Sequence, residues 1–167
     1  IEIGDDGPYR EKILIPKDKY GLRLRGKKGR WPVITSEGLP PGSLPLVRAE
    51  GAGAFLERLV LLGGLSVSAG DVRLRWLIVH GGIGTGGYKR KCLCAECLVT
   101  GYASNRDRGG RDGPVAFGNC LFVGTANVGS FRAANYEFLC CTILGALEKG
   151  RFRDSIVGEP KLGAYGS

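Results

Sequence analysis

The chain has 167 residues, 43% of them hydrophobic and 24% charged, so it can bury one core, and we expect a single domain over residues 1–167. The 24 lysines and arginines against 16 acidic residues give a formal net charge of +8, which favours a polyanionic partner. No stretch approaches the roughly 20 apolar residues that span a bilayer, and the first residues lack the shape of a signal peptide, which argues against a membrane partner and predicts a cytoplasmic protein.

Short strands with one apolar face and one basic face are expected in the first part of the chain. Ile13–Ile15 is an apolar run stopped by a proline, so we predict an edge strand. Tyr20–Arg25 alternates leucines with Arg23 and Arg25, so a strand there buries the leucines and exposes both arginines. Three further basic residues extend that surface: Lys27, Lys28 and Arg30.

The clearest strand runs from Asp71 to Val79. Simple alternation puts one face at Val72, Leu74, Trp76 and Ile78, and the other at Arg73 and Arg75 with Leu77 and Val79. The segment that follows, 81–87, is so rich in glycine that we expect a flexible connector there. The earlier apolar segment 54–62 is too short for periodicity to separate a helix from a buried strand.

Three closely spaced cysteines, Cys92, Cys94 and Cys97, are the sharpest local motif. Thiolates at this spacing can converge on one tetrahedral ion, and the preceding basic residues favour the thiolate form, which predicts a structural zinc. The fourth ligand would be His80 or Cys120. The alternative is three reduced cysteines in a partly buried turn.

The second half of the chain is expected to contain a lobe, a strand and a helix. Residues 80–114 read as an inserted lobe that carries the zinc knuckle, because much of this stretch is too polar and glycine-rich to pack. Residues 115–123 predict a returning strand. Apolar residues three and four apart, followed by Gly150, predict a helix over Ala133–Lys149. No internal repeat stands out.

The arginines that face away from the leucine and tryptophan core could contact a row of phosphates. An ordinary solvated sheet face is the alternative. We expect RNA contacts from the basic residues of these strands and of the nearby loops and tail: Arg23, Arg25, Lys27, Lys28, Arg30, Arg73, Arg75, Lys89, Arg90, Arg106, Arg108, Arg111 and Lys161.

Catalysis has thinner support in the sequence. A cysteine nucleophile needs a base, and His80 is the single histidine of the chain. A small enzyme that uses Cys97 or Cys120 with His80 is the alternative from a different class, while a ribosomal or other ribonucleoprotein structural protein is the alternative among RNA binders.

Several segments together resemble one family. They are Leu22–Arg25, Trp31–Gly38, Glu57–Leu62, Cys94–Tyr102 and Tyr136–Lys149 with the glycine-rich tail. In this order they resemble the backbone subunit of CRISPR effector complexes, of the RAMP superfamily and the type I-D-like, Cascade-type form.

The resemblance implies an α+β fold, in which an RRM-like or ferredoxin-like antiparallel sheet carries packing helices and an inserted cysteine-bearing lobe with zinc. It implies a non-catalytic subunit for antiviral defence that polymerises along guide RNA, with copies of itself, other effector subunits and target nucleic acid as partners. Gly158–Gly166 would match the closing glycine-rich loop near the RNA. Sequence specificity would then come from base pairing by the guide.

Overall fold

The chain folds into a β-solenoid, a stack of coils in which each strand pairs with strands of the neighbouring coils. The computed structural model describes residues 1–39, 45–68, 70–85, 91–105, 115–123, 136–147, 150–160 and 164–166. Within these ranges there is no helix, and all 17 strand ladders are parallel.

The strands form two sheets, which we call sheet A and sheet B. Sheet A has 14 strands: β1 (Glu2–Ile3), β3 (Arg23–Gly26), β4 (Val33–Thr35), β6 (Phe55–Leu62), β8 (Val72–His80), β10 (Cys92–Ala95), β11 (Leu98–Val99), β13 (Val115–Gly118), β14 (Leu121–Phe122), β15 (Tyr136–Leu139), β16 (Thr142–Leu147), β17 (Gly150–Arg153), β18 (Ile156–Pro160) and β19 (Ala164–Gly166). Sheet B has five strands in the order β12-β9-β7-β5-β2: β2 (Ile13–Ile15), β5 (Val47–Ala49), β7 (Leu65–Val67), β9 (Gly82–Thr85) and β12 (Tyr102–Asn105).

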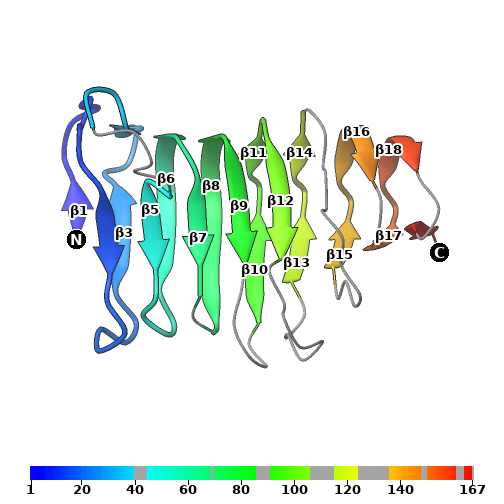
Figure 1. Cartoon of the computed structure of the whole chain (residues 1–167), viewed down its shortest axis with the longest axis horizontal. Coiled ribbons are helices and arrows are strands. Elements are labelled where there is room, and N and C mark those ends of the chain that lie inside the picture. Colours follow the sequence, from blue (N-terminus) through cyan, green and yellow to red (C-terminus); the bar gives the residue numbers. More distant parts are fainter. Residues whose placement is uncertain are drawn as a thin grey trace.

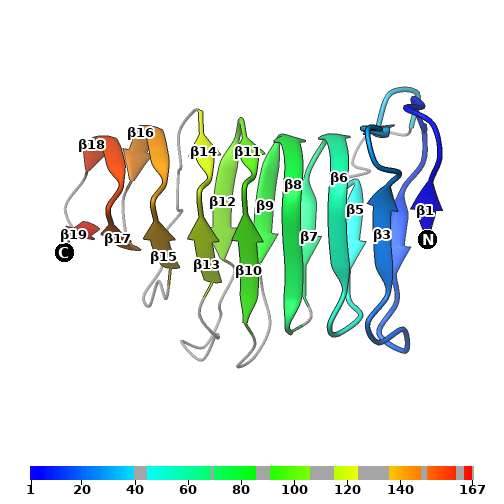
Figure 2. The same cartoon turned by 180° about the vertical axis from the view of Figure 1, so that it is seen from behind.

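Each coil passes once through sheet A and, in the central coils, once through sheet B. The chain runs from β6 to β7, then from β8 to β9, and then through β10 and β11 to β12. Figures 1 and 2 show the coils side by side along the long axis, with the first and last strands at opposite ends. Successive coils therefore present the same side chain positions in columns along the solenoid.

From β6 onward, a single residue bends each coil within sheet A, and we call it the corner residue. The corner residues have a left-handed backbone conformation with φ between 51° and 56°, which is uncommon outside glycine. Their neighbours pair in register from coil to coil, so the corners stack in one column. They follow one another at intervals of 18, 20, 23, 21 and 14 residues: Arg58, Trp76, Glu96, Asn119, Cys140 and Asp154.

The corner shifts the alternation of buried and exposed side chains. The residue two positions before the corner and the residue one position after it both point inward, so inward residues lie three apart. The chain thus contains a repeat that recurs at uneven intervals. Its inward pairs in successive coils are Leu56 and Leu59, Leu74 and Leu77, Cys94 and Cys97, Phe117 and Cys120, and Phe138 and Cys141.

Aromatic side chains from neighbouring coils stack inside the solenoid. The rings of Phe117 and Phe138 are parallel, with centroids 5.1 Å apart, and Phe122 meets both of them edge-on. All three are at most 2% exposed. A buried phenylalanine typically contributes about 3–5 kcal/mol relative to alanine, so this stack is a main source of cohesion between the later coils.

Glycines form the turn from sheet A into sheet B where two coils approach closely. A Cβ on Gly101 would coincide with the carbonyl group of Gly81, and a Cβ on Gly81 would lie 2.9 Å from the backbone of Gly63. Gly81 is therefore a tight turn directly before β9, and the prediction of a flexible connector from residue 81 onward is wrong over Gly82–Thr85.

The N-terminal segment is tied to the first coil by hydrogen bonds. The backbone N–H of Tyr9 donates to the carbonyl of Val33 over 2.7 Å. Asp6 accepts from the backbone N–H of Trp31 over 2.8 Å and pairs with Arg30 over 3.1 Å. The Trp31 and Arg30 hydrogen bonds lower the pKa of Asp6.

The predicted α+β fold class is wrong. The sheets are parallel rather than antiparallel, no helix packs on them in the described ranges, and the cysteine segment is not an inserted lobe within such a fold, because β10 is a strand of sheet A between β8 and β13. Two local predictions are confirmed. Ile13–Ile15 forms the strand at one edge of sheet B, and Leu24 is buried between exposed Arg23 and Arg25.

The predicted helix over Ala133–Lys149 is also wrong in its described part, which contains β15, the corner Cys140 and β16. Phe138, Cys141 and Ile143 are the inward residues here. The corner places Phe138 and Cys141 three apart, which is also the spacing of one helix face. The repeat of the solenoid therefore imitates helical periodicity.

The corner conformation makes a stability prediction. Replacing Asn119 with valine should lower the free energy of unfolding by about 1–2 kcal/mol, because a β-branched side chain is strained at a positive φ. Asn119→Gly should keep the stability to within about 0.5 kcal/mol. Ala116→Val, at an ordinary strand position of the same coil, serves as control in urea unfolding. Equal stabilities of the two valine variants would contradict a left-handed corner.

The Asp6 contacts make a pH prediction. Because the folded pKa of Asp6 is lowered, its contribution to stability is present above the ordinary carboxyl pKa near 4 and is lost as pH falls through the lowered value. Asp6→Asn should therefore lower the thermal midpoint at pH 7 and leave it unchanged near pH 2. Asp18→Asn, at an exposed carboxylate, is the control. A difference that persists at pH 2 would assign the effect to something other than the carboxylate charge.

Candidate nucleic-acid interface

Four arginines predicted to bind RNA lie on one side of three neighbouring strands. β6 lies between β3 and β8, and its residues pair in register with both. One row across the strands is Arg23, Phe55 and Arg73, and the next is Arg25, Glu57 and Arg75. We call these six residues the arginine face. Sequence alternation found the arginines, and the stacking of coils brings them together.

The second row of the arginine face is largely neutralised by acidic partners. Arg25 pairs with Glu2 over 3.0 Å, and Arg75 donates to Glu96 over 2.9 Å. The bond to Glu96 raises the pKa of Arg75. Glu57 is nearly buried and pairs with Arg58 over 2.7 Å. This row is therefore a network of ion pairs rather than a row of free cations.

The first row has a different character. Arg23 lies over the ring of Phe55, with its Cζ 5.9 Å from the ring centroid. In the described part of the chain, neither Arg23 nor Arg73 makes an ion pair, and both side chains are exposed. Two strand spacings place the Cα atoms of the two arginines about 9.5 Å apart, with the half-buried ring between them. Two cations thus flank an aromatic side chain on an open surface.

Trp76 is a corner residue rather than a core residue, so its predicted place on the apolar face is wrong, as is that of Ile78. The left-handed conformation turns Trp76 outward and turns Leu77 and Val79 inward. The Cζ atoms of Arg75 and Arg58 lie 4.1 and 5.5 Å from its ring. Sequence reasoning missed this arginine–tryptophan cluster, because simple alternation does not register a corner.

The other predicted basic residues are placed only in part. Lys27, Lys28 and Arg30 lie in the exposed turn between β3 and β4, where Arg30 pairs with Asp6. Six predicted contacts lie outside the described residues: Lys89, Arg90, Arg106, Arg108, Arg111 and Lys161.

The cysteines among the predicted zinc ligands are buried in the solenoid, whereas His80 is exposed, and the structure does not bring all of them together. The Sγ atoms of Cys92 and Cys94 are 4.0 Å apart on the inward side of β10. Cys92 pairs with Val72 at the start of β8, whereas His80 lies at the other end of that strand. The Nδ1 atom of His80 is 2.9 Å from Oγ1 of Thr100. Among the described residues no group of three or more ligating side chains surrounds one point. A structural zinc stays a prediction.

The spacing of the cysteine motif has a second explanation in the fold. Cys97, Cys120 and Cys141 occupy the position after the corner in successive coils, and we call them the thiol column. Cys120 donates to the carbonyl of Gly118 over 3.3 Å and to that of Cys94 over 3.7 Å. Cys141 repeats the pattern, and so does the Ser155 hydroxyl. A small donor at this position satisfies carbonyls at the bend.

The thiols of the column also interact with one another. Side-chain interaction with Cys120 lowers the pKa of Cys141 to about 7 and lowers that of Cys97, and the interactions with Cys141 and Cys97 raise the pKa of Cys120. The three side chains are only 2–3% exposed, so reagents in solution do not reach them in the folded protein. His80 is exposed and contacts Thr100, whereas Cys97 and Cys120 are buried, and in the described part of the chain no hydrogen bond joins His80 to either thiol.

Comparisons with protein-family models, with curated proteins and with solved structures found no match to this chain. The fold implied by the resemblance to the RAMP superfamily, an antiparallel ferredoxin-like sheet, is not the fold of the described residues. The described part of the chain contains no helix that is long and apolar enough to cross a membrane.

The thiol column makes a reactivity prediction. All six cysteines are free, and Cys140 alone is exposed. A chromogenic disulfide reagent should modify one thiol quickly and the other five only at the rate of unfolding. The fast reaction should be absent from the Cys140→Ser variant. Rapid modification of three more thiols after addition of a chelator would instead support zinc at Cys92, Cys94 and Cys97.

Proposed function

We propose that this chain is a non-catalytic RNA-binding module that holds single-stranded RNA on the arginine face. The observation that supports the proposal is the row formed by Arg23, Phe55 and Arg73, in which two exposed cations flank an aromatic ring. Single-strand binders combine basic surfaces that track the phosphates with aromatic side chains that stack on bases.

In this proposal, each residue of the row has a role. Arg23 and Arg73 each neutralise a phosphate, with release of counterions, and the ring of Phe55 supports a base between them. Arg25 and Arg75 already have carboxylate partners, so they contribute less to phosphate binding and more to keeping the surface in place. The net charge of +8 adds long-range attraction for a polyanion.

Two modes of RNA binding are compatible with this proposal. Several copies along one guide strand, with other subunits, would correspond to the CRISPR effector role that the sequence resemblance suggests, although its implied fold is not found. One copy on a folded RNA would correspond to a ribonucleoprotein component. Native mass spectrometry of the complex counts the copies. We also propose a cytoplasmic location, since a reducing compartment suits the five buried thiols.

The row makes a binding prediction. Arg23→Ala with Arg73→Ala should weaken binding to a labelled 20-nucleotide RNA without stable secondary structure, and should reduce the slope of log affinity against log salt by about 1.4, because two phosphate contacts are lost. Phe55→Leu should weaken binding about tenfold by removing a stacked base while keeping an apolar side chain. Fluorescence anisotropy measures both effects.

The matched control is Arg10→Ala with Arg48→Ala, which removes two exposed arginines outside sheet A. It should leave the slope nearly unchanged. A sulfated polysaccharide tested in parallel separates charge from base recognition, because Phe55→Leu should affect RNA alone. Equal losses in the control and in the Arg23 and Arg73 variant would overturn the assignment of this row.

A further inference from the structure

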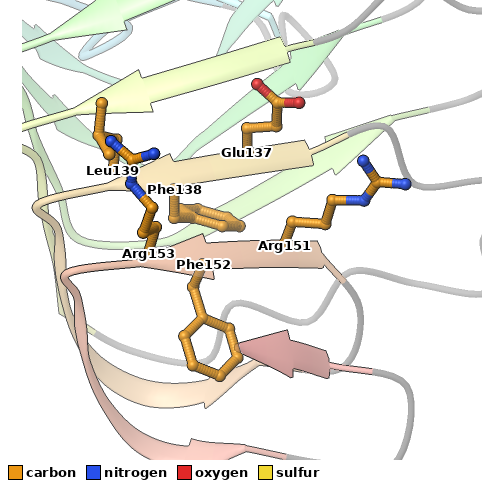
Figure 3. Close-up of a pocket in the computed structure, with 6 residues that line it drawn as sticks. All are labelled: Glu137, Phe138, Leu139, Arg151, Phe152 and Arg153. Atoms are coloured by element: carbon orange, nitrogen blue, oxygen red, sulfur yellow. The ribbon is translucent and has the colours of Figure 1, made fainter. Parts of the chain in front are cut away.

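A second pair of arginines lies at an open hollow between β15 and β17. The hollow has a volume of about 290 Å³, and six residues line it: Glu137, Phe138, Leu139, Arg151, Phe152 and Arg153. Figure 3 shows Arg151, Arg153, Glu137 and Leu139 on one side of the two strands and the phenylalanines on the other. Arg153 pairs with Asp154 over 3.4 Å, and no ion pair of Arg151 occurs within the described ranges.

The register of the strands aligns this hollow with the arginine face. Arg73 is followed along its column by Leu93, Ala116, Glu137 and Arg151. The neighbouring column runs from Arg75 through Ala95, Gly118 and Leu139 to Arg153. Four strand steps separate the two arginine pairs, which corresponds to about 19 Å.

The surface between the two arginine pairs carries few large side chains and is mostly apolar. Ala95, Ala116 and Gly118 offer almost no side chain, while Leu93 and Leu139 are 47% and 43% exposed. Glu137 is the single acidic residue of this stretch of the two columns. A chain lying across the strands would thus meet cations at both ends and an apolar floor between them.

We propose that the two columns form a binding lane along the solenoid axis, with Arg151 and Arg153 as a second phosphate anchor beyond the arginine face. This inference rests on the proposed function, because it takes RNA as the ligand. A single strand of RNA with stacked bases rises about 3.4 Å per nucleotide, so 19 Å corresponds to roughly six nucleotides. The exposed leucines lie under the bases of the spanning segment.

The lane has a consequence for ligand length. An RNA that reaches both anchors gains from the second one as an intramolecular contact, whereas a shorter RNA reaches one anchor at a time. As the RNA is lengthened from four to ten nucleotides, its affinity should therefore rise steeply. The rise should be at least tenfold larger than the gain expected from the greater number of binding positions on a longer RNA. A surface without a second anchor gives a gradual rise.

The experiment measures competition by unlabelled oligouridines of four to twelve nucleotides against a labelled 20-nucleotide RNA. In Arg151→Ala with Arg153→Ala, we expect the steep rise to disappear while tetranucleotides keep at least half of their affinity. Arg10→Ala with Arg48→Ala should retain the rise. All four side chains are exposed, and circular dichroism checks that the fold is kept.

The outcomes separate the lane from the proposed function. If RNA binding depends on Arg23 and Arg73 but has the same length dependence in wild type and in the Arg151 and Arg153 variant, the lane is wrong and the arginine face stands. If the labelled RNA does not bind at all, the proposed function itself fails, and if it binds equally well to the Arg23 and Arg73 variant, both the arginine face as its site and the lane fail. Tight binding of a sulfated polysaccharide alone would replace RNA by another polyanion and overturn both.

Discussion

The left-handed corner, with the hydrogen bonds that satisfy it, is the constraint on which the rest of the structure depends. Each corner shifts the alternation of inward and outward side chains by one residue. At the corner Asn119, the backbone N–H donates to the carbonyl of Leu139 in the next coil. Because an unsatisfied buried carbonyl costs about 1–3 kcal/mol, a donor that reaches the carbonyls at the bend stabilises it. The thiol column supplies such donors in three coils and Ser155 in a fourth.

Local features of this chain could be predicted from its sequence, whereas its architecture could not. The leucine and arginine faces of β3 follow from simple alternation, and Ile13–Ile15 was identified as an edge strand. The repeat was missed because connections of different length separate its copies, so a search at one fixed period does not detect it. Without the repeat, nothing local distinguishes parallel from antiparallel pairing.

The corner also explains why particular motifs pointed elsewhere. Inward residues three apart resemble a helix face at Phe138 and Cys141. The position of Trp76 was inverted because the corner shifts the alternation. The spacing of Cys94 and Cys97 follows from the corner as well, and a zinc at these cysteines stays a prediction. The four arginines of the arginine face were found nonetheless, because Arg23 and Arg25 lie in a strand without a corner and Arg73 and Arg75 precede the corner Trp76, so strict alternation holds for all four.

The uneven length of the coils has a practical consequence for engineering. Corner intervals range from 14 to 23 residues, yet the strands before the corner keep their register from β8 through β10, β13 and β15 to β17. Differences in length are thus absorbed between strands, where doubling a loop costs only about 0.6 kcal/mol. Foreign peptides or labels could be inserted in these connections while the columns from Arg73 to Arg151 stay aligned. The solenoid would then act as a ruler that displays added groups at multiples of the strand spacing.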